Sequence, residues 1–247
     1  MAKPAKTDRQ AVIEQMRKQQ KSAEKRRGYA IVGVCVVIAL LIIGAAAYQP
    51  VKDWWDLRGF NDLALEDIGA PASACQKVET KKADGNQDHV APGTPIDYTN
   101  APPAFGQHYN EPDPMARKLY SADDRPALGT LVHNLEHGYT ILWYDETAAG
   151  DNEMMTDIRA IAKKLAGTDN FRTKFKAVPW LSTDENGRTF PSGEHIALTH
   201  WSIGGADAGS TDNQVGVWQY CSAPSGDALK RFMIQYPYLD SPEPNAM

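Results

Sequence analysis

The longest apolar stretch of the chain is residues 28–48, GYAIVGVCVVIALLIIGAAAY, which contains no charged residue. As an α-helix, a stretch of this length is about 30 Å long, which matches the hydrocarbon core of a bilayer. A helix also satisfies its own backbone hydrogen bonds, which lipid cannot do. The pattern therefore predicts one transmembrane helix over residues 28–48.

A cleaved signal peptide is the alternative for this stretch, since Ala45, Ala46 and Ala47 supply small residues near its end. The apolar part of a cleavable signal is usually shorter, about 7–15 residues. The length therefore favours an uncleaved anchor.

Charge is distributed unevenly on the two sides of the apolar stretch. Residues 1–27 contain nine Lys and Arg and three Asp and Glu, whereas the rest of the chain contains 17 and 28. Basic flanks stay in the cytoplasm, so we expect a cytoplasmic basic helix over 1–27 and an extracytoplasmic C-terminal part. Residues 49–74 then form a juxtamembrane stalk, in which Trp54 and Trp55 suit the membrane interface.

The patterning beyond residue 75 predicts one extracytoplasmic α/β domain over 75–241, a small sheet flanked by helices. Residues 76–126 are rich in Pro, Gly, Asp and Asn, so we expect an irregular coat there. Periodicity and end signals predict helices and strands in the rest of the domain. The helices are expected at 129–137, 152–165 and 227–236, the strands at 139–144, 174–180 and 195–203, a short strand or loop at 215–221, and a frayed tail at 242–247.

Three cysteines are present. Cys35 lies within the predicted membrane span, where a small polarisable side chain needs no special role. Cys75 and Cys221 both fall in the extracytoplasmic domain, and an oxidising compartment favours a disulfide between them. Two thiolate metal ligands are a weaker alternative, because neither cysteine has a second cysteine nearby in the chain.

Composition excludes several classes of protein. With 42% hydrophobic and 23% charged residues, the chain is neither a polytopic membrane protein nor wholly disordered. An acidic outer domain argues against nucleic acid as a partner. We find no phosphate-binding loop, dinucleotide fingerprint, nucleophile elbow or CxxC pair, so no cofactor-binding or catalytic residue is predicted.

The densest chemistry of the sequence is HNLEHG, residues 133–138. On a helix, His133 and His137 share a face and Glu136 lies beside it. The spelling matches the inverted zincin motif HxxEH, but the helix is short and no third ligand follows it, so a peptidase is disfavoured.

A simpler metal site uses His108, His133, Glu136 and His137 as ligands, with His89 nearby in the irregular coat. Imidazoles and a carboxylate suit Zn²⁺ or Cu²⁺. The alternative is a polar cluster in which these side chains bond backbone groups and lock the coat onto the sheet. The sequence leaves both open. His195 and His200 bracket a strand and fall on its opposite faces, with His200 structural and His195 at the surface.

The segments DHV (88–90), PPAFGQHY (102–109), LVHNLEHGYTILWY (131–144) and HIALTHW (195–201) resemble a bacterial family known as domain of unknown function 3105. Ala104, Phe105 and Gln107 depart from the family pattern, whereas residues 135–138 match it. The resemblance covers roughly 85–240 and implies a membrane-anchored outer protein of a largely actinobacterial family. It also implies that His108, His133, Glu136 and His137 meet in space.

Three functions follow as expectations. The first is a non-catalytic accessory protein that docks on other membrane or envelope proteins, with a respiratory-chain complex as one candidate partner by location. The second is an extracytoplasmic domain that binds Cu or Zn. A metal-dependent hydrolase with Glu136 as base is a less favoured third.

Overall fold

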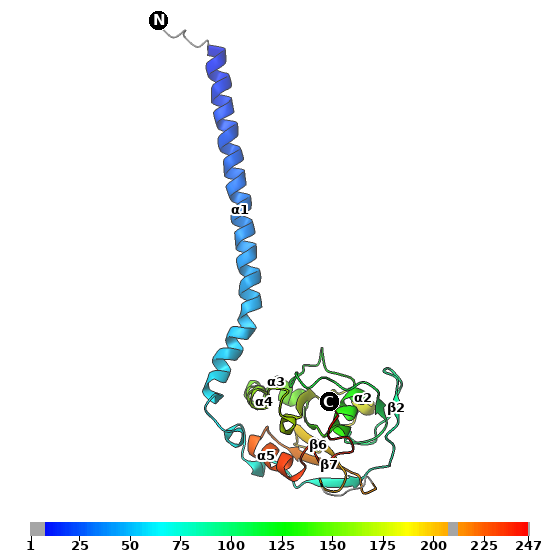
Figure 1. Ribbon diagram of the computed structural model, residues 1–247. Coiled ribbons are helices and arrows are strands. Elements are labelled where there is room, and N and C mark those ends of the chain that lie inside the picture. The colour runs from blue at the N-terminus through cyan, green and yellow to red at the C-terminus, as the bar shows by residue number, and fades with distance from the viewer. Residues whose placement is uncertain (1–7, 207–211, 247) are drawn as a thin grey trace. The chain divides into compact units, whose positions relative to one another are not determined.

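The computed structural model describes residues 8–206 and 212–246. The chain divides into two compact units, one up to Asp56 and one from Leu57 onward, and each is described separately (Figure 1). Lys3 and Lys6 of the predicted basic segment lie outside the described residues.

The first unit contains nearly all of helix α1, Asp8–Leu57. Its most apolar window has a mean hydropathy of 3.0 and none of it is buried, so this helix is long and apolar enough to span a membrane. The helix continues through Pro50, where one backbone hydrogen bond is lost, and its axis bends near its C-terminal end (Figure 1).

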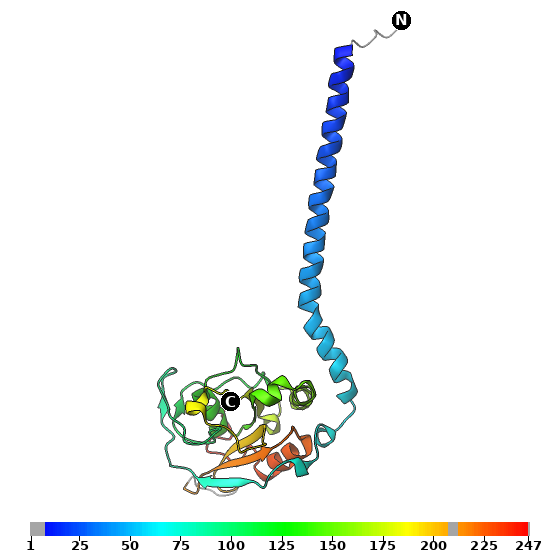
Figure 2. The same cartoon turned by 180° about the vertical axis from the view of Figure 1, so that it is seen from behind.

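The second unit contains a five-stranded sheet in the order β1-β7-β6-β4-β5. All neighbours are antiparallel except β4 and β5, which are parallel. Figure 2 shows the cyan β1 beside the orange β7, although they lie far apart in the sequence. The strands are β1 Glu79–Lys82, β4 Thr140–Tyr144, β5 Phe175–Pro179, β6 Ile196–Ser202 and β7 Val215–Cys221.

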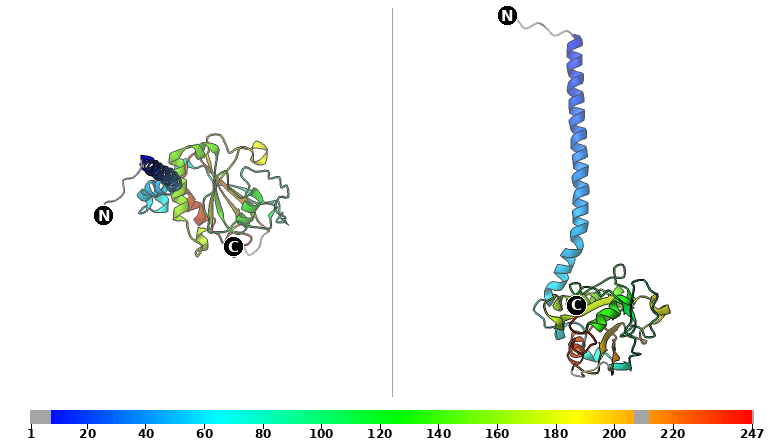
Figure 3. Two further views of the ribbon diagram at one scale, coloured as in Figure 1. Left: turned by 90° about the horizontal axis from the view of Figure 1, so that it is seen from above. Right: turned by 45° about the vertical axis from the view of Figure 1, so that its right-hand side comes forward.

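Helices cover both faces of the sheet (Figure 3). Successive residues of β4 alternate between two cores, with Trp143 in one and Leu142 in the other. Leu142 packs with α4 and α5, whereas Trp143 packs with α2 and the irregular segment. The helices are α2 Leu128–Glu136, α3 Glu146–Gly150, α4 Asn152–Lys164 and α5 Gly226–Gln235. The observed class is the predicted mixed α/β class.

Local sequence signals explain the crossover from β4 to β5. Parallel strands need a long connection, and α3 and α4 supply it. Asp151 caps α4 by accepting hydrogen bonds from the backbone N–H groups of Glu153 and Met154. Ile158 and Ile161 then place the apolar side of α4 in the core.

The Pro-rich segment forms the expected irregular coat, with one addition. It contains a short parallel pair, β2 His89–Val90 and β3 His108–Tyr109. Phe105 in the same segment is buried against the aromatic rings of Trp201 and Trp218. The segment is therefore packed onto the sheet.

Two segments are more ordered than the sequence suggested. Residues 57–74, the larger part of the segment 49–74 that was expected to form a partly ordered stalk, belong to the globular unit, since Ile68 is fully buried and the N–H of Ala70 donates to the carbonyl of Pro224. This segment contains three short 3-10 helices, Arg58–Phe60, Leu65–Asp67 and Ala72–Ala74. Two further 3-10 helices, elsewhere in the globular unit, are Phe171–Thr173 and Asp184–Gly187.

The tail is also not frayed over residues 242–246. The buried ammonium group of Lys174 donates to the carbonyls of Pro244 and Ala246 at 2.9 and 2.7 Å, and to that of His137 at 2.7 Å.

A disulfide joins Cys75 to Cys221, as predicted, across a sequence separation of 146.

Candidate metal centre

Helix α2 carries three of the predicted ligands, and its end fixes where they point. Leu131 and Leu135 bury one side of the helix, which stops at Glu136. His137 is the capping residue, and Gly138 follows with φ of +87°. A Cβ on Gly138 would come within 2.3 Å of the carbonyl oxygen of Tyr238. Glycine is thus required directly after the motif.

The two short strands bring the coat histidines to α2. His89 and His108 are register partners in the β2–β3 pair. Helix α2 approaches β3 closely at Gly129, where a Cβ would lie 2.9 Å from the ring of Tyr109. This close contact brings the imidazoles of the coat over the end of α2.

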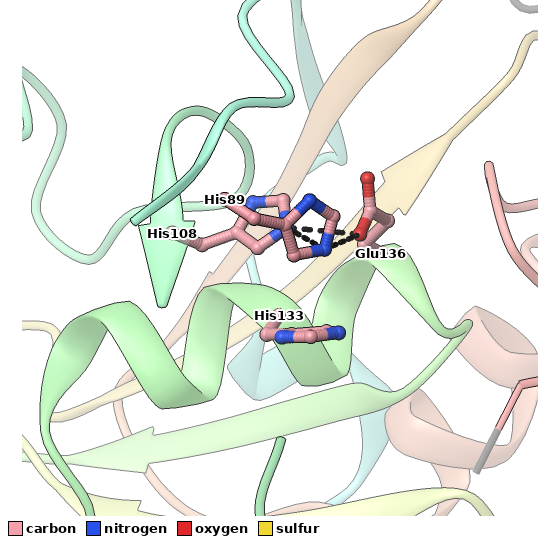
Figure 4. A group of neighbouring side chains, drawn as sticks. All are labelled: His89, His108, His133 and Glu136. Carbon is pink, nitrogen blue, oxygen red and sulfur yellow. Dashed lines mark hydrogen bonds and ion pairs between the residues drawn. The ribbon is translucent and has the colours of Figure 1, made fainter. Parts of the chain in front are cut away.

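Three ligand atoms from these elements converge on one point (Figure 4). Nε2 of His108 lies 2.9 Å from Oε2 of Glu136 and 3.2 Å from Nε2 of His89. Nε2 of His89 is 3.5 Å from the same carboxylate oxygen. His133 joins them, and the ligand atoms of all four residues lie within 4.8 Å of one another.

A second set of contacts adjoins the first. Nε2 of His133 lies 2.9 Å from Nε2 of His137, which is itself 3.6 Å from Oε2 of Glu243. Glu136, His137 and Glu243 also place their ligand atoms within 4.8 Å of one another. Glu136 belongs to both sets.

Backbone carbonyls fix the tautomers of two of the imidazoles. Nδ1 of His108 lies 2.8 Å from the carbonyl oxygen of Gly106, and Nδ1 of His133 lies 2.5 Å from that of Tyr109. Because a carbonyl only accepts, each Nδ1 carries the hydrogen, and each neutral ring keeps an electron pair on Nε2. Outer hydrogen bonds of this kind orient metal-binding histidines.

Burial and neighbouring charge set the protonation states of the cluster. Burial raises the pKa of Glu136, but hydrogen bonding and charge from His108, with a bond from Gln87, outweigh it and lower the pKa overall. Burial lowers the pKa of His133, and burial together with His133 lowers the pKa of His137 to about 4. At neutral pH these groups are a carboxylate and two neutral imidazoles.

A chain of side-chain hydrogen bonds holds the other oxygen of Glu136. Nε2 of Gln87 donates to Oε1 of Glu136 at 2.9 Å, and Nε2 of Gln214 donates to Oε1 of Gln87 at 3.0 Å. The indole N–H of Trp201 donates to Gln214 at 2.9 Å. Oε1 is thereby engaged, whereas Oε2 is buried and faces Nε2 of His108 at 2.9 Å.

This arrangement has the chemistry of a transition-metal site. Ligands that lie about 2.0–2.1 Å from Zn²⁺ are about 3.3 Å from each other in tetrahedral geometry. The separations between His89, His108 and Glu136 are 2.9 to 3.5 Å. The His108 and Glu136 side chains are buried, and that of His89 is 39% exposed, which gives an ion a path from solvent.

The structure brings together the four residues singled out from the sequence: His108, His133, Glu136 and His137. It adds His89, noticed in the sequence but outside that set, together with Gln87 and Glu243. Gln87 is two residues before His89, but no motif in the neighbouring sequence predicts its role in the cluster. Glu243 lies in the segment expected to be frayed, so no signal pointed to it.

Histidines 195 and 200 lie outside the cluster. His195 bonds Asp145 through Nδ1 at 2.9 Å and its side chain is 28% exposed. His200 is buried, with its ring nitrogens against the carbonyls of Tyr139 and Asp240.

Burial of the HxxEH histidines argues against a hydrolase. His133 and His137 are only 5% and 4% exposed. A metal-dependent hydrolase needs an open position for its substrate beside these rings, and their burial limits that space.

Comparison with known proteins adds a family. No curated protein and no solved structure matches the chain significantly. Residues 89–246 match a family model described as "Protein of unknown function (DUF3105)", and this match extends over all the cluster residues except Gln87. The chain therefore belongs to the DUF3105 family.

Proposed function

We propose that the globular unit is a metal-binding domain that holds Zn²⁺ or Cu²⁺ at His89, His108, His133 and Glu136. One observation carries this proposal. Ligand atoms of three imidazoles and one buried carboxylate lie within 4.8 Å of one another, although they come from three separate segments of the chain. A carboxylate and neutral imidazoles are all electron-pair donors to a cation.

The donor set favours borderline metals. Imidazole nitrogen suits Zn²⁺ and Cu²⁺, whereas Mg²⁺ and Ca²⁺ prefer oxygen ligands. The polar cluster that the sequence left open is compatible with this proposal. The Nδ1 atoms of His108 and His133 bond backbone carbonyls of the coat, and their Nε2 atoms stay available to an ion.

Elemental analysis tests the proposal. After dialysis against Zn²⁺ and removal of free ion, the detergent-solubilised wild type should retain at least about one ion per chain, and His108→Ala far less. His195→Ala is the matched control, because His195 is a half-buried histidine outside the cluster. Wild type with less than about 0.1 ion per chain after exposure to both Zn²⁺ and Cu²⁺ would exclude a metal site.

The same proposal includes a location. The exposed apolar helix and its basic N-terminal flank support a single-pass anchor with a cytoplasmic N-terminus and an extracytoplasmic metal-binding domain. Protease added to intact spheroplasts should then digest the globular domain and leave an N-terminal epitope protected. Protection of the globular domain until the membrane is permeabilised would reverse the orientation.

A second candidate function is that of an accessory protein in a membrane complex, such as a respiratory-chain complex. It is supported by an apolar surface on the globular unit, where Ile234 and Leu239 are 70% and 43% exposed and line a cavity of about 480 Å³. Purification in mild detergent should yield a stoichiometric membrane subunit with the wild type and not with Ile234→Lys. A monomer in both preparations rejects this candidate.

A further inference from the structure

Two ligand groups, rather than one, meet at Glu136. The first contains His89, His108 and His133, and the second contains His137 and Glu243. A single ion with bonds of about 2 Å reaches ligand atoms up to roughly 4 Å apart. His89 and Glu243 belong to different groups of ligand atoms, and the two groups have only Glu136 in common.

Glu243 is held at this position by its backbone. Its N–H donates to the carbonyl oxygen of Glu136 at 2.9 Å. Lys174 binds the carbonyls of Pro244 and Ala246 on the C-terminal side and that of His137 next to the cluster. The carboxylate is thus brought beside His137 by contacts that do not involve the carboxylate itself.

The position of the Glu243 carboxylate is explained by little other than its nearness to His137. Its side chain is 51% exposed and Oε2 lies 3.6 Å from Nε2 of His137. This distance is too long for a hydrogen bond but fits two ligands of one ion. The shared residue, Glu136, has its buried Oε2 beside Nε2 of His108.

We propose that the cluster is a two-ion centre, in which Glu136 is shared between an inner site at His89, His108 and His133 and an outer site at His137 and Glu243. This inference rests on the proposed metal-binding function. The outer site takes a divalent cation of the same class, Zn²⁺ or Cu²⁺, since it offers one imidazole and two carboxylates. Carboxylates that bridge two ions typically hold them about 3.5–4 Å apart.

The two sites differ in access to solvent. Glu136 and His108 of the inner site have side chains 1% and 0% exposed, whereas Glu243 of the outer site is half exposed. The outer ion should therefore exchange faster with chelators than the inner one. Two carboxylates also offset part of the charge of two dications at a partly buried position.

Metal stoichiometry of the full chain in detergent separates the possibilities. After equilibration with Zn²⁺, elemental analysis should give two ions per chain for wild type, one for Glu243→Gln and none for Glu136→Gln. The Glu243→Gln change retains the backbone hydrogen bond to Glu136, so the tail stays in place. Glu153→Gln, an exposed glutamate on α4, is the control and should bind two.

Cu²⁺ gives an independent readout. Two bridged Cu²⁺ ions couple magnetically, so the wild type should show an electron paramagnetic resonance signal well below two spins per chain. Glu243→Gln should show one uncoupled Cu²⁺. Circular dichroism of the metal-free variants should confirm that each of them folds.

The outcomes distinguish the two proposals. One ion per chain in wild type, unchanged in Glu243→Gln, overturns the two-ion centre and leaves the proposed function intact. No ion in wild type overturns both. Two ions that persist in Glu243→Gln place the second ion elsewhere and also overturn the assignment made here.

Discussion

At the scale of the residue, the two ring nitrogens of each buried histidine decide its role. His108 and His133 use Nδ1 to bond a backbone carbonyl and direct Nε2 toward other side chains. Both nitrogens of His200 face carbonyl oxygens, and its pKa is lowered by burial. His200 therefore has no nitrogen to offer to a ligand, which agrees with its predicted structural role.

Gln87 should matter for metal affinity although it is not a ligand. Its amide holds Oε1 of Glu136 and so orients the carboxylate. Loss of such an orienting bond typically lowers metal affinity about 10–100-fold. We expect Gln87→Ala to weaken Zn²⁺ binding by this factor in a competition titration with a chromophoric chelator.

Gln76→Ala is the control for that titration, because Gln76 is an exposed glutamine bonded to Glu194. Equal Zn²⁺ affinity in both variants would show that Gln87 does not orient the site.

Asp157 should make the domain less stable as the pH rises. Burial, followed by Glu153 and Asp151, raises the pKa of Asp157 from 3.8 to about 6. The unfolded chain then releases this proton at lower pH than the folded one, so ionisation costs stability between about pH 4 and pH 6. We expect Asp157→Asn to have a higher Tm than wild type at pH 8, with a smaller difference near pH 4.5.

Thermal unfolding of the detergent-solubilised protein at both pH values measures this difference. Asp123→Asn, an exposed aspartate, should leave the Tm unchanged at either pH. A gain for Asp157→Asn that is the same at both pH values would mean that its cause is not ionisation.

At the scale of the element, Lys174 joins the strand β5 region to the C-terminal segment. Charged hydrogen bonds contribute about 1.5–3 kcal/mol each in favourable cases, and Lys174 makes three to carbonyls. We expect Lys174→Ala to lower the free energy of unfolding by about 3 kcal/mol. It should also make residues 242–246 sensitive to carboxypeptidase, as followed by mass spectrometry.

Lys82→Ala on the exposed strand β1 should change neither property. Equal resistance of the tail in both lysine variants would mean that other contacts hold Glu243 in place.

Periodicity predicted the elements that have a clear inside and outside. Residues 152–165 bury one helical face, so hydrophobic spacing predicted α4. The β-branched and aromatic run at 139–144 predicted β4, which is buried on both faces. Strand β1 escaped this reasoning because all four of its residues, ETKK, are exposed. Pairs as short as β2 and β3 have no period to detect.

The candidate site was easiest to predict where its residues are close in sequence, and His108, from a distant segment, was added by its residue type and by the family resemblance. His133, Glu136 and His137 share one turn of helix, and their spacing made the site visible. Glu243 reaches the cluster through a backbone contact with a distant segment, and Gln87 through side-chain hydrogen bonds, and neither contact leaves a local pattern. Polar, Pro-containing termini resemble disordered ones until such contacts are known.

At the scale of the whole molecule, the disulfide is the longest covalent constraint on the fold. Cys75 and Cys221 are separated by 146 residues, and closing such a loop restricts the unfolded chain. We expect the double variant Cys75→Ser, Cys221→Ser to lose about 4 kcal/mol of unfolding free energy in urea, followed by tryptophan fluorescence.

Cys35→Ser is the matched control, because Cys35 is a free cysteine on α1. Its urea midpoint should equal that of the wild type. A midpoint for the double variant within error of the wild type would show that the bond adds nothing to stability.

The ligand residues of the cluster lie far apart in the sequence. This spacing affects how the protein would respond to a shortage of metal ions. The ligand residues extend from His89 to Glu243, so an unfolded chain offers an ion little beyond His133 and His137. A chain that binds metal as proposed would fold before it takes up the ion, and the ion would add about 2.7 kcal/mol of stability at 100 times its dissociation constant. In cells starved of the ion, the protein would then be less stable and shorter-lived.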